Sequence, residues 1–433
     1  MKYITTAFYT LLSLGLSTTN LYAESGKVYG LEELMQVTDK HNRNIKIAEK
    51  AVEAAEGNIT VAVGNFMPEL KVTAGQTQVI RQSPTEDGTT NFYSMQPKKS
   101  VIYRAEMGGK IFAGGRLWKT LEKEKVLTER AKSDIEVTRE QTHKNLVSKY
   151  YNLGFAQAAL EIEKKKLVFF KKHLVEMEAK AKAGAIRKNT LLGVKTDFWS
   201  AENDVAKAEL DFDNAKRELA FLSGNDIGNN FSVLPLKEEF KGKDTAQFSN
   251  TSAGVSRSPD VITSGHDLKA ADIDVQMAKS YYYPELSYFA AYQKDRDITN
   301  ARFRETGSIG LEIKVPFANS FFNASGKTRA AMAQKLQSEI QHENTTREIT
   351  LNLGTKKNDL MAASHDIDST NKMMQYLEEV IKSDKAFLKA GEMTYQEYKK
   401  DYVEYLNAQK NWYNAISRGN TLYKNLQIDY GMQ

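Results

Sequence analysis

The chain contains the same landmarks twice, and this internal repeat constrains its fold more than any other feature. Pro-Glu-Leu occurs at residues 68–70 and again at residues 284–286. At the same distance before each copy stands a residue that favours helix N-caps, Asn42 in the first and Ser258 in the second. Pro259 also suits the first turn of a helix. The sequence therefore predicts two copies of one structural unit, with a helix that begins at the same place in each.

Two long tracts of the chain, residues 98–234 and 317–433, contain no proline. Because proline inside a helix costs about 3 kcal/mol, these tracts can form unusually long helices. They are rich in Ala, Glu, Lys, Gln and Leu, and their apolar residues recur at spacings of three and four. Each tract contains Lys-Ala-Gly, where we expect the helix to turn back. Helices of this length predict coiled-coil packing or a helical barrel.

Beside the two Pro-Glu-Leu copies the apolar period changes to alternation. Aliphatic and polar residues alternate through residues 308–315 and, in nearly the same way, through residues 101–108. A third strand begins at residues 70–75, and residues 286–293 form a weaker fourth. Each strand thus has one apolar and one polar face. Each repeat is predicted to run helix, strand, loop, strand, very long helix, glycine turn and helix, which is an α+β chain.

Two-faced strands suit the surface of a β-sandwich as well as a transmembrane barrel. Four strands are too few for either, because a sandwich needs more to bury a core and the smallest transmembrane barrels have about eight. Beyond the N-terminus, no run approaches the ~20 apolar residues of a membrane-spanning helix. Any membrane span is therefore expected to be β, and to require several chains. Three chains would supply twelve strands.

The N-terminus has the pattern of a secretory signal peptide. Lys2 precedes an apolar run at residues 4–16, and Ala23 fits a cleavage site. The run is too short and too polar for a membrane anchor. Without cysteine, neither a disulfide framework nor a lipidated N-terminal thiol is expected. The formal net charge of +5 is too small and too dispersed to favour nucleic acid.

Motifs for catalysis or cofactor binding are missing from the sequence. Two glycine-rich segments approach a phosphate-binding loop, but Phe321 stands where the first needs glycine and Gly115 where the second needs lysine. The six histidines have no metal-binding spacing, and we interpret them as isolated surface residues. No nucleophile motif is present. We therefore expect no enzyme activity, no cofactor and no metal site.

Together these features resemble the TolC-like outer-membrane factors, the outer membrane efflux protein family of efflux pumps and type I secretion systems. The resemblance rests on four segments: N-x-N-I … F-x-P-E-L at residues 42–70, S-P-D-V … Y-Y-P-E-L at 258–286, KIFAGGRLW at 110–118 and AEL…AKRELAFLSG at 208–224. It implies a trimer, in which a 12-stranded outer-membrane β-barrel continues as a long periplasmic α-helical barrel of twelve columns.

On this resemblance the chain divides into four parts. They are a signal peptide at residues 1–23, a first repeat at 24–224 (strands about 69–81 and 100–112, turn at Gly184), an equatorial linker at 225–257, and a second repeat at 258–433 (strands about 285–294 and 305–316, turn at Gly391). The polar loops at residues 83–99 and 294–305 are expected to be extracellular.

The function implied is that of an outer-membrane exit duct in a tripartite efflux pump or type I secretion system. The homotrimer would sit in outer-membrane lipid as a passive channel, with its helices in the periplasm. Docking with a periplasmic adaptor protein and an inner-membrane pump would open it, and no nucleic acid would be involved. The competing hypothesis is a secreted or cell-surface coiled-coil scaffold without channel activity. The two-faced strands favour the duct, because a rod does not need them.

The resemblance also implies three sets of site residues. Helix–strand corners are expected at Pro68, Glu69, Pro284, Glu285, Gly114 and Gly115. Adaptor docking is expected at Ala183, Gly184, Ala185, Ala390, Gly391 and Glu392, whose glycines would equally serve as plain helix caps. The pore constriction is expected at Arg187, Lys188, Asn189, Thr190, Glu397, Lys400 and Asp401. A mixed ring of Glu397 with Lys400 or Arg187 would hold the tip shut, unless these charges face solvent outside the tunnel.

Overall fold

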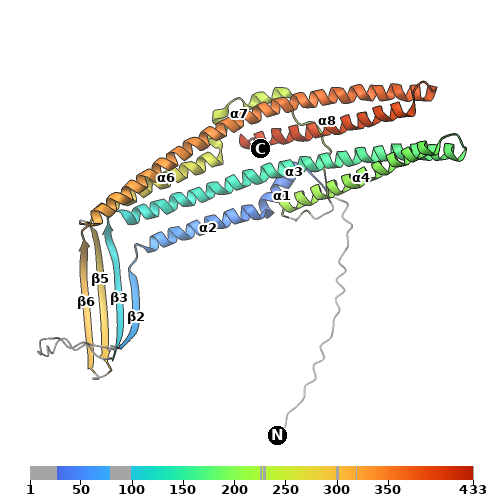
Figure 1. Ribbon diagram of the computed structural model, residues 1–433. Coiled ribbons are helices and arrows are strands. Elements are labelled where there is room, and N and C mark those ends of the chain that lie inside the picture. The colour runs from blue at the N-terminus through green and yellow to red at the C-terminus, as the bar shows by residue number, and fades with distance from the viewer. Residues whose placement is uncertain are drawn as a thin grey trace, which may run out of the picture.

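A computed structural model of the protein describes residues 27–78, 99–224, 227, 231–298, 302–317 and 319–432. The expected signal peptide lies outside the described residues. So does the expected loop at residues 83–99, except for Lys99. The described chain is elongated, with a sheet at one end and long helices along the rest of its length (Figure 1). None of the described helices is both long enough and apolar enough to cross a lipid bilayer.

The helices are α1 (Leu31–His41), α2 (Arg43–Gly64), α3 (Arg116–Lys182), α4 (Lys188–Leu222), α5 (Thr251–Arg257), α6 (Pro259–Lys279), α7 (Asn319–Ala390) and α8 (Tyr395–Asp429), with 3-10 helices η1 (Gly242–Phe248) and η2 (Ser280–Tyr282). The strands are β1 (Lys27–Tyr29), β2 (Glu69–Gln78), β3 (Lys99–Ala113), β4 (Phe231–Val233), β5 (Glu285–Asp297) and β6 (Arg302–Lys314). α3 has 67 residues and α7 has 72. At about 1.5 Å per residue each is roughly 100 Å long, and the prediction of very long helices is confirmed.

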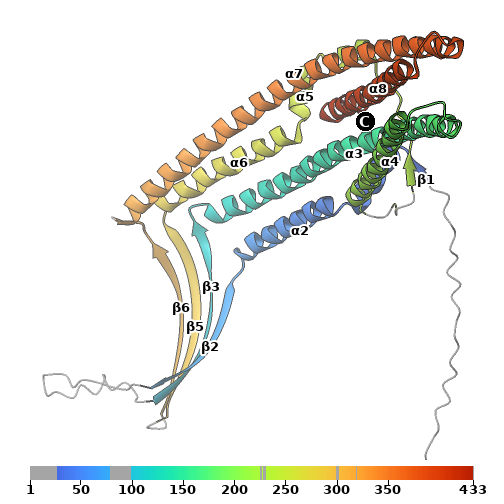
Figure 2. The ribbon, with the colours of Figure 1, turned by 45° about the vertical axis from the view of Figure 1, so that its right-hand side comes forward.

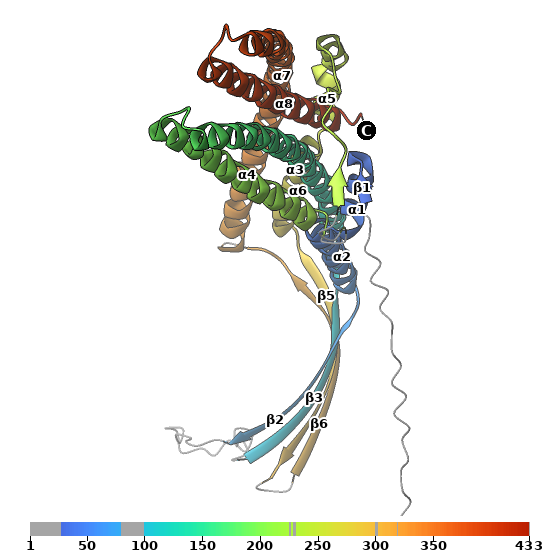
Figure 3. The same ribbon diagram turned by 90° about the vertical axis from the view of Figure 1, so that its right-hand side faces the viewer.

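The long strands form one antiparallel sheet in the order β2-β3-β5-β6. The sheet is strongly curved (Figure 3). β5 and β6 extend further than expected, because the charged residues assigned to their loop pair across the ladder instead. Lys294 lies opposite Glu305, with 2.5 Å between Nζ and Oε1. Oppositely charged cross-strand pairs of this kind stabilise a ladder.

The two faces of the sheet differ in polarity, as the alternation predicts. Residues directly opposite each other share a face, so the register assigns each side chain. One face carries Leu70, Val72, Tyr103, Met107, Leu286, Tyr288, Ile309, Leu311 and Ile313. The other carries Lys71, Thr73, Arg104, Glu106, Gln293, Ser308 and Glu312. Many of the apolar side chains are exposed in the single chain, Ile309 at 86%.

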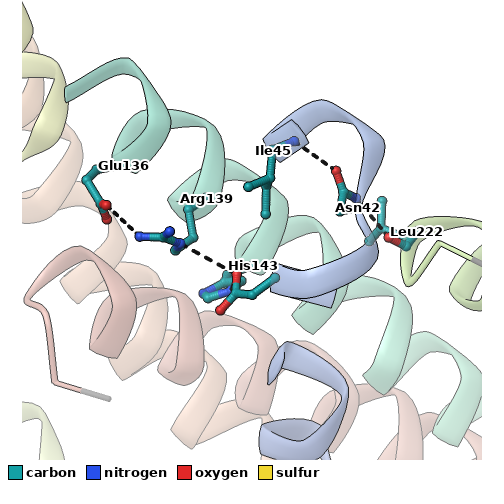
Figure 4. Close-up of polar contacts among 7 residues, drawn as sticks. Asn42, Ile45, Glu136, Arg139, His143 and Leu222 are labelled. Carbon is teal, nitrogen blue, oxygen red and sulfur yellow. Dashed lines mark hydrogen bonds and ion pairs between the residues drawn. The ribbon is translucent and has the colours of Figure 1, made fainter. Parts of the chain in front are cut away.

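Each shorter helix meets the end of a return helix, and one side chain joins them. The side-chain amide of Asn42 donates to the carbonyl of Leu222, the last residue of α4, at 2.8 Å. Its side-chain oxygen accepts from the backbone N–H of Asn44, also at 2.8 Å, and so caps α2. The same oxygen accepts from the N–H of Ile45 at 3.4 Å (Figure 4). In the second repeat Arg257 donates to the carbonyl of Tyr430, just past α8, at 3.0 Å. The predicted helix starts after Asn42 and Ser258 are confirmed.

These joints produce four helical columns in one chain. α4 continues into α2 and α8 into α6, while α3 and α7 each run unbroken (Figures 1 and 2). α3 contacts α2 and α6 on the side of the sheet, and α4 and α8 on the side of the turns. α7 contacts α6 and α8. The columns therefore form a single layer that ends in α2 and α4 at one edge and in α7 at the other.

The short elements lie on one side of this layer, at mid-length (Figure 3). One buried cluster joins Leu34 of α1 to Leu146, Tyr151 and Leu219 of α3 and α4. A second joins Phe240 and Phe248 to α7 and α8 through Leu360, Ile367, Ile416 and Leu426. Burying one such side chain stabilises by about 1.5–3 kcal/mol. The first cluster also includes Ile428 of α8, so it joins the two hairpins at mid-length.

The interpretation of the histidines as isolated surface residues is wrong for two of them. His143 is 2% exposed and its Nε2 lies 2.8 Å from Oδ1 of Asp39, near Arg139 (Figure 4). His173 is 5% exposed. Both lie on stripes of α3 that pack against other helices, and spacing between histidines does not reveal which stripe is buried.

Candidate functional site

Both predicted docking segments lie at helical turns at the end of the molecule opposite the sheet (Figure 1). Gly184 has φ +71° and Gly391 has φ +78°. After each glycine the next N–H bonds back to the helix: Ala185 to the carbonyl of Lys180 at 2.9 Å, and Glu392 to that of Phe387 at 3.0 Å. This is the Schellman ending, which requires a left-handed residue and so favours glycine.

Steric crowding does not explain why glycine occupies these two positions. A Cβ at Gly184 or Gly391 would meet no atom within 4 Å. Their backbone conformation is therefore the constraint, and a larger residue there is strained whatever surrounds it. Ala183, Ala185, Ala390 and Glu392 are all exposed. These neighbours, rather than the glycines, carry the side chains that are exposed at the two turns.

The residues predicted for the constriction in the first repeat lie at the start of α4. Arg187 is its N-cap without a side-chain hydrogen bond, and Lys188, Asn189 and Thr190 form the first turn. All four are exposed. Cations at a helix N-terminus face the positive end of its dipole, which disfavours them by a few tenths to about 1 kcal/mol. An anionic group facing Arg187 and Lys188 would therefore be stabilised.

Glu397, in the second repeat, already has a structural role. Its Oε2 accepts from the backbone N–H and the hydroxyl of Thr394, at 2.9 and 2.7 Å, and its N–H donates to the same hydroxyl at 3.4 Å. This reciprocal arrangement is a capping box. The two bonds from Thr394 lower the pKa of Glu397, so its carboxylate stays charged. The T-x-x-E spacing in the sequence is the signal that would have predicted it.

The other two residues predicted for the constriction in this repeat have different surroundings. Lys400 is exposed, whereas Asp401 is half-buried near Asp384 of α7. Burial and the charge of Asp401 raise the pKa of Asp384. In the described part of the chain no ion pair joins Arg187, Lys188 or Lys400 to a carboxylate. The structure therefore brings the two halves of the predicted constriction to the same end of the molecule without pairing them in one chain.

One ion pair near the turns joins the two repeats, and sequence reasoning missed it. Nζ of Lys399 on α8 lies 2.8 Å from Oδ2 of Asp197 on α4, and both side chains are less than one-third exposed. Within the first hairpin, Lys195 pairs with Glu178 at 3.3 Å. The partners in the first pair are far apart in sequence, and no periodic pattern marks them.

Aromatic side chains pack beside this ion pair. Phe169 of α3 stacks on Tyr402 of α8, with ring centroids 4.3 Å apart. His173 stacks nearly parallel on Tyr395, at an interplanar angle of 11°. Burial lowers the pKa of His173 to about 4, so its ring is neutral at neutral pH. A cavity of about 940 Å³ opens between α3, α7 and α8 at these rings.

The predicted helix–strand corners lie where helices meet the sheet. Pro68 and Pro284 directly precede β2 and β5, and Tyr283 is extended, with ψ 151°, as the residue before proline should be. Glu69 begins β2 on its polar face, opposite Gly108.

Between β3 and α3, Gly114 and Gly115 have φ +62° and +80°. A Cβ on Gly114 would lie 2.4 Å from the carbonyl oxygen of Ser280, so only glycine fits there. Glu285 forms an ion pair with Arg116, a residue that the sequence analysis did not single out.

Comparison with known proteins supports this arrangement. The family model "Outer membrane efflux protein" matches residues 34–225. The probable outer membrane lipoprotein SilC of Salmonella typhimurium is 21% identical over 393 residues, covering 86% of this chain and 77% of that protein. The same fold occurs in the Campylobacter jejuni outer membrane channel CmeC, with a TM-score of 0.78 and 18% identity over 93% of this chain and 85% of that one.

The outer membrane protein VceC of Vibrio cholerae also shares this fold. Its TM-score is 0.73 at 17% identity, covering 93% of this chain and 97% of that chain. The repeated helix–strand–strand–helix architecture predicted from the sequence is thus that of solved outer membrane channels. Residues 34–225 thus match the outer membrane efflux protein family, and the protein lies in the outer membrane, with its helical part in the periplasm.

Proposed function

We propose that three copies of this chain form an exit duct through the outer membrane, as part of a tripartite efflux pump or type I secretion system. The observation that carries the proposal is the four-stranded sheet, which has one apolar face and two open edges, β2 and β6. An unpaired strand edge is a template for another strand. Joining β6 of one copy to β2 of the next removes both edges, and three copies would close a barrel of twelve strands.

The helix layer supports the same assembly. Its α7 edge exposes Phe321, Phe322 and Leu336, and its opposite edge exposes Ile47 and Val61 of α2 and Leu210 of α4. Exposed apolar patches of this kind mark interaction surfaces. Contact between the two edges in a trimer would bury them and close twelve columns into a tunnel. A single threefold axis would then run through both the barrel and the tunnel.

Docking with a periplasmic adaptor protein is proposed at the two turns. The exposed residues Ala183, Ala185, Ala390 and Glu392 surround glycines that end the helices tightly. Small exposed side chains let a partner approach the backbone closely. An inner-membrane pump would complete the assembly, and the duct itself would catalyse no reaction.

A resting closure is proposed at the same end. Arg187 and Lys188 lie at the N-terminus of α4, where an anion is favoured, and Glu397 is an exposed carboxylate held in a fixed orientation by Thr394. Threefold symmetry would place three copies of each charge around one axis. Charges of opposite sign 4 Å apart attract by about 4 kcal/mol at an effective dielectric constant of 20, and by less in salt. Docking would open this ring.

Two measurements on the detergent-extracted protein test the proposal. Native mass spectrometry should give three chains per particle, and the same particles should conduct ions in a planar lipid bilayer. A monodisperse monomer that still inserts into lipid would overturn the trimer. A stable particle that never conducts, with or without an adaptor, would favour the coiled-coil scaffold instead.

A further inference from the structure

A small cavity lies at the junction of the sheet and the helices, and its walls are rich in cations and aromatic rings. Its volume is about 210 Å³. One wall is formed by Tyr281, Tyr283 and Glu285, where η2 leads into β5. The other is formed by Lys314, Pro316 and Lys327, where β6 leads into α7. The proposed function does not account for this combination of residues.

Two cations approach the ring of Tyr281. Nζ of Lys327 lies 3.7 Å from the ring centroid, and the guanidinium carbon of Arg116 lies 4.5 Å from it. Cations within about 6 Å of a ring face are attracted to it. Tyr281 thus holds two positive charges at the cavity, and 37% of the residue remains exposed.

The charges around the cavity do not balance. Glu285 is the one carboxylate among its lining residues, and Arg116 already pairs with it. Across the described residues, neither Lys314 nor Lys327 forms an ion pair with a carboxylate. Two ammonium groups therefore face the cavity, and the one carboxylate among the lining residues, Glu285, lies opposite Lys314 and is already paired with Arg116. An anion that entered would gain both of them.

The strand register shows which side of the sheet the cavity adjoins. Glu285 lies opposite Lys314, and the next pair is Leu286 opposite Ile313. Successive side chains point to opposite faces, so Glu285 and Lys314 belong to the polar face. In the proposed duct this face lines the lumen, and the cavity would be open to solutes in transit.

We infer that this junction cavity is a binding site for organic anions: a carboxylate, sulfonate or phosphate carried on an aromatic body. The anionic group would lie between Lys314 and Lys327, whose ammonium group is held over the ring of Tyr281, and the aromatic body would pack on Tyr283 and Pro316. The inference depends on the proposed duct in one respect only, which is that solutes reach the cavity from the lumen. An anionic lipid headgroup has the same chemistry, and the test distinguishes the two sources.

The test uses the full chain, extracted in detergent and assembled. Isothermal titration calorimetry compares 1-naphthalenesulfonate with 1-naphthylmethylammonium, which has a similar ring and the opposite charge. The variants are Lys327→Gln and Lys314→Gln, with Tyr281→Phe and Tyr281→Leu to separate the ring from the hydroxyl. Arg329→Gln is the matched control, because it removes an exposed α7 cation that does not line the cavity. A competition arm adds phosphatidylglycerol.

The sulfonate should bind, and the ammonium compound should bind at least about tenfold more weakly. Each lysine variant should weaken sulfonate binding about tenfold, Tyr281→Leu should weaken it, and Tyr281→Phe and Arg329→Gln should not. Equal affinity for both naphthalenes, or unchanged affinity in both lysine variants, would overturn the inference. Displacement of the sulfonate by phosphatidylglycerol would overturn a solute site in favour of a lipid site.

The bilayer conductance of the same particles separates this inference from the proposed duct. Particles that conduct but do not bind the sulfonate overturn the anion site alone. Particles that bind the sulfonate at both lysines but never conduct support the anion site and overturn the duct.

Discussion

Lys399 on α8 and Asp197 on α4 form an ion pair that joins the two helical hairpins close to their turns, with 2.8 Å between Nζ and Oδ2. α3 lies between these two helices, so the pair bridges across it. If the turns must separate for the duct to open, this contact has to break. In the proposed closure it would therefore act as a brace of the closed tip within a single chain.

Replacing Lys399 by Met should favour the open channel. A partly exposed ion pair contributes up to about 1 kcal/mol, which corresponds to a change of up to about fivefold in the open-to-closed ratio. Single-channel recording in planar bilayers measures this ratio. The matched control is Lys195→Met, which breaks the pair with Glu178 inside one hairpin. Equal effects of the two variants would contradict a brace between the repeats.

Glu397→Gln separates the charge of Glu397 from its capping role. Gln retains the capping box but removes the negative charge. If Glu397 contributes to a mixed ring, Glu397→Gln should raise the open probability and weaken any cation preference. Thr394→Ala keeps the charge and removes the cap, at a cost of about 1 kcal/mol to the start of α8. An unchanged open probability and selectivity in Glu397→Gln would mean that the closure lies elsewhere.

Bulky residues beside the turn glycines should block adaptor docking without straining the turns. We expect Ala185→Trp with Ala390→Trp to abolish export while trimers persist in the membrane, since both positions are exposed and the glycines keep their left-handed backbone. A drug- or substrate-accumulation assay measures export. Ser383→Trp, exposed on α7 before the turn, is the control. Equal loss in the control would contradict docking at the turns.

Acid should loosen the contact between α3 and α8 at His173. Its folded-state pKa of about 4 lies below the ordinary value near 6.5. As the pH falls from about 6.5 to 4, the unfolded chain takes up a proton that the folded chain refuses, so stability falls across this window. His173→Phe retains the stacking on Tyr395 and should remove that part of the pH dependence. Thermal unfolding at pH 7, 5 and 4 measures it, with His365→Phe at an exposed position as the control.

Gly114→Ala should impair folding far more than Gly115→Ala. Both positions have positive φ, which costs a residue with a Cβ about 1–2 kcal/mol. At Gly114 the added Cβ would also lie 2.4 Å from the carbonyl oxygen of Ser280, whereas at Gly115 it meets nothing within 4 Å. The yield of assembled protein in the membrane compares them. Similar yields would show that the corner can shift to accept a side chain.

Local signals in the sequence predict the elements well. Asn42 favours a helix start, the missing prolines permit α3 and α7, and the alternation near Pro284 gives the two faces of the sheet. These features depend on neighbours in the chain. Lys399 and Asp197 are different, because only the packing of three helices brings them together. The burial of His173 likewise depends on helical phase over many turns, where a small error per turn accumulates.

The charged residues around the turns show the same limit at the candidate site. Position relative to Gly391 suggested that Glu397, Lys400 and Asp401 act together. The structure gives them three environments: a cap, an exposed position, and a half-buried one beside Asp384. Neighbours on a helix point in different directions, and a group of nearby charges in the sequence is not a group in space.

The joints at Leu222 and Tyr430 have a mechanical consequence. Two of the four columns are continuous covalent rods, whereas the other two are interrupted at mid-length and held by hydrogen bonds such as that from Asn42 to Leu222. A rod resists bending along its whole length, but an end-to-end contact can pivot. α4 and α8 can therefore swing about these pivots while α2 and α6 stay fixed to the sheet. Movement of the helical turns is therefore not transmitted to the sheet at the lipid-facing end.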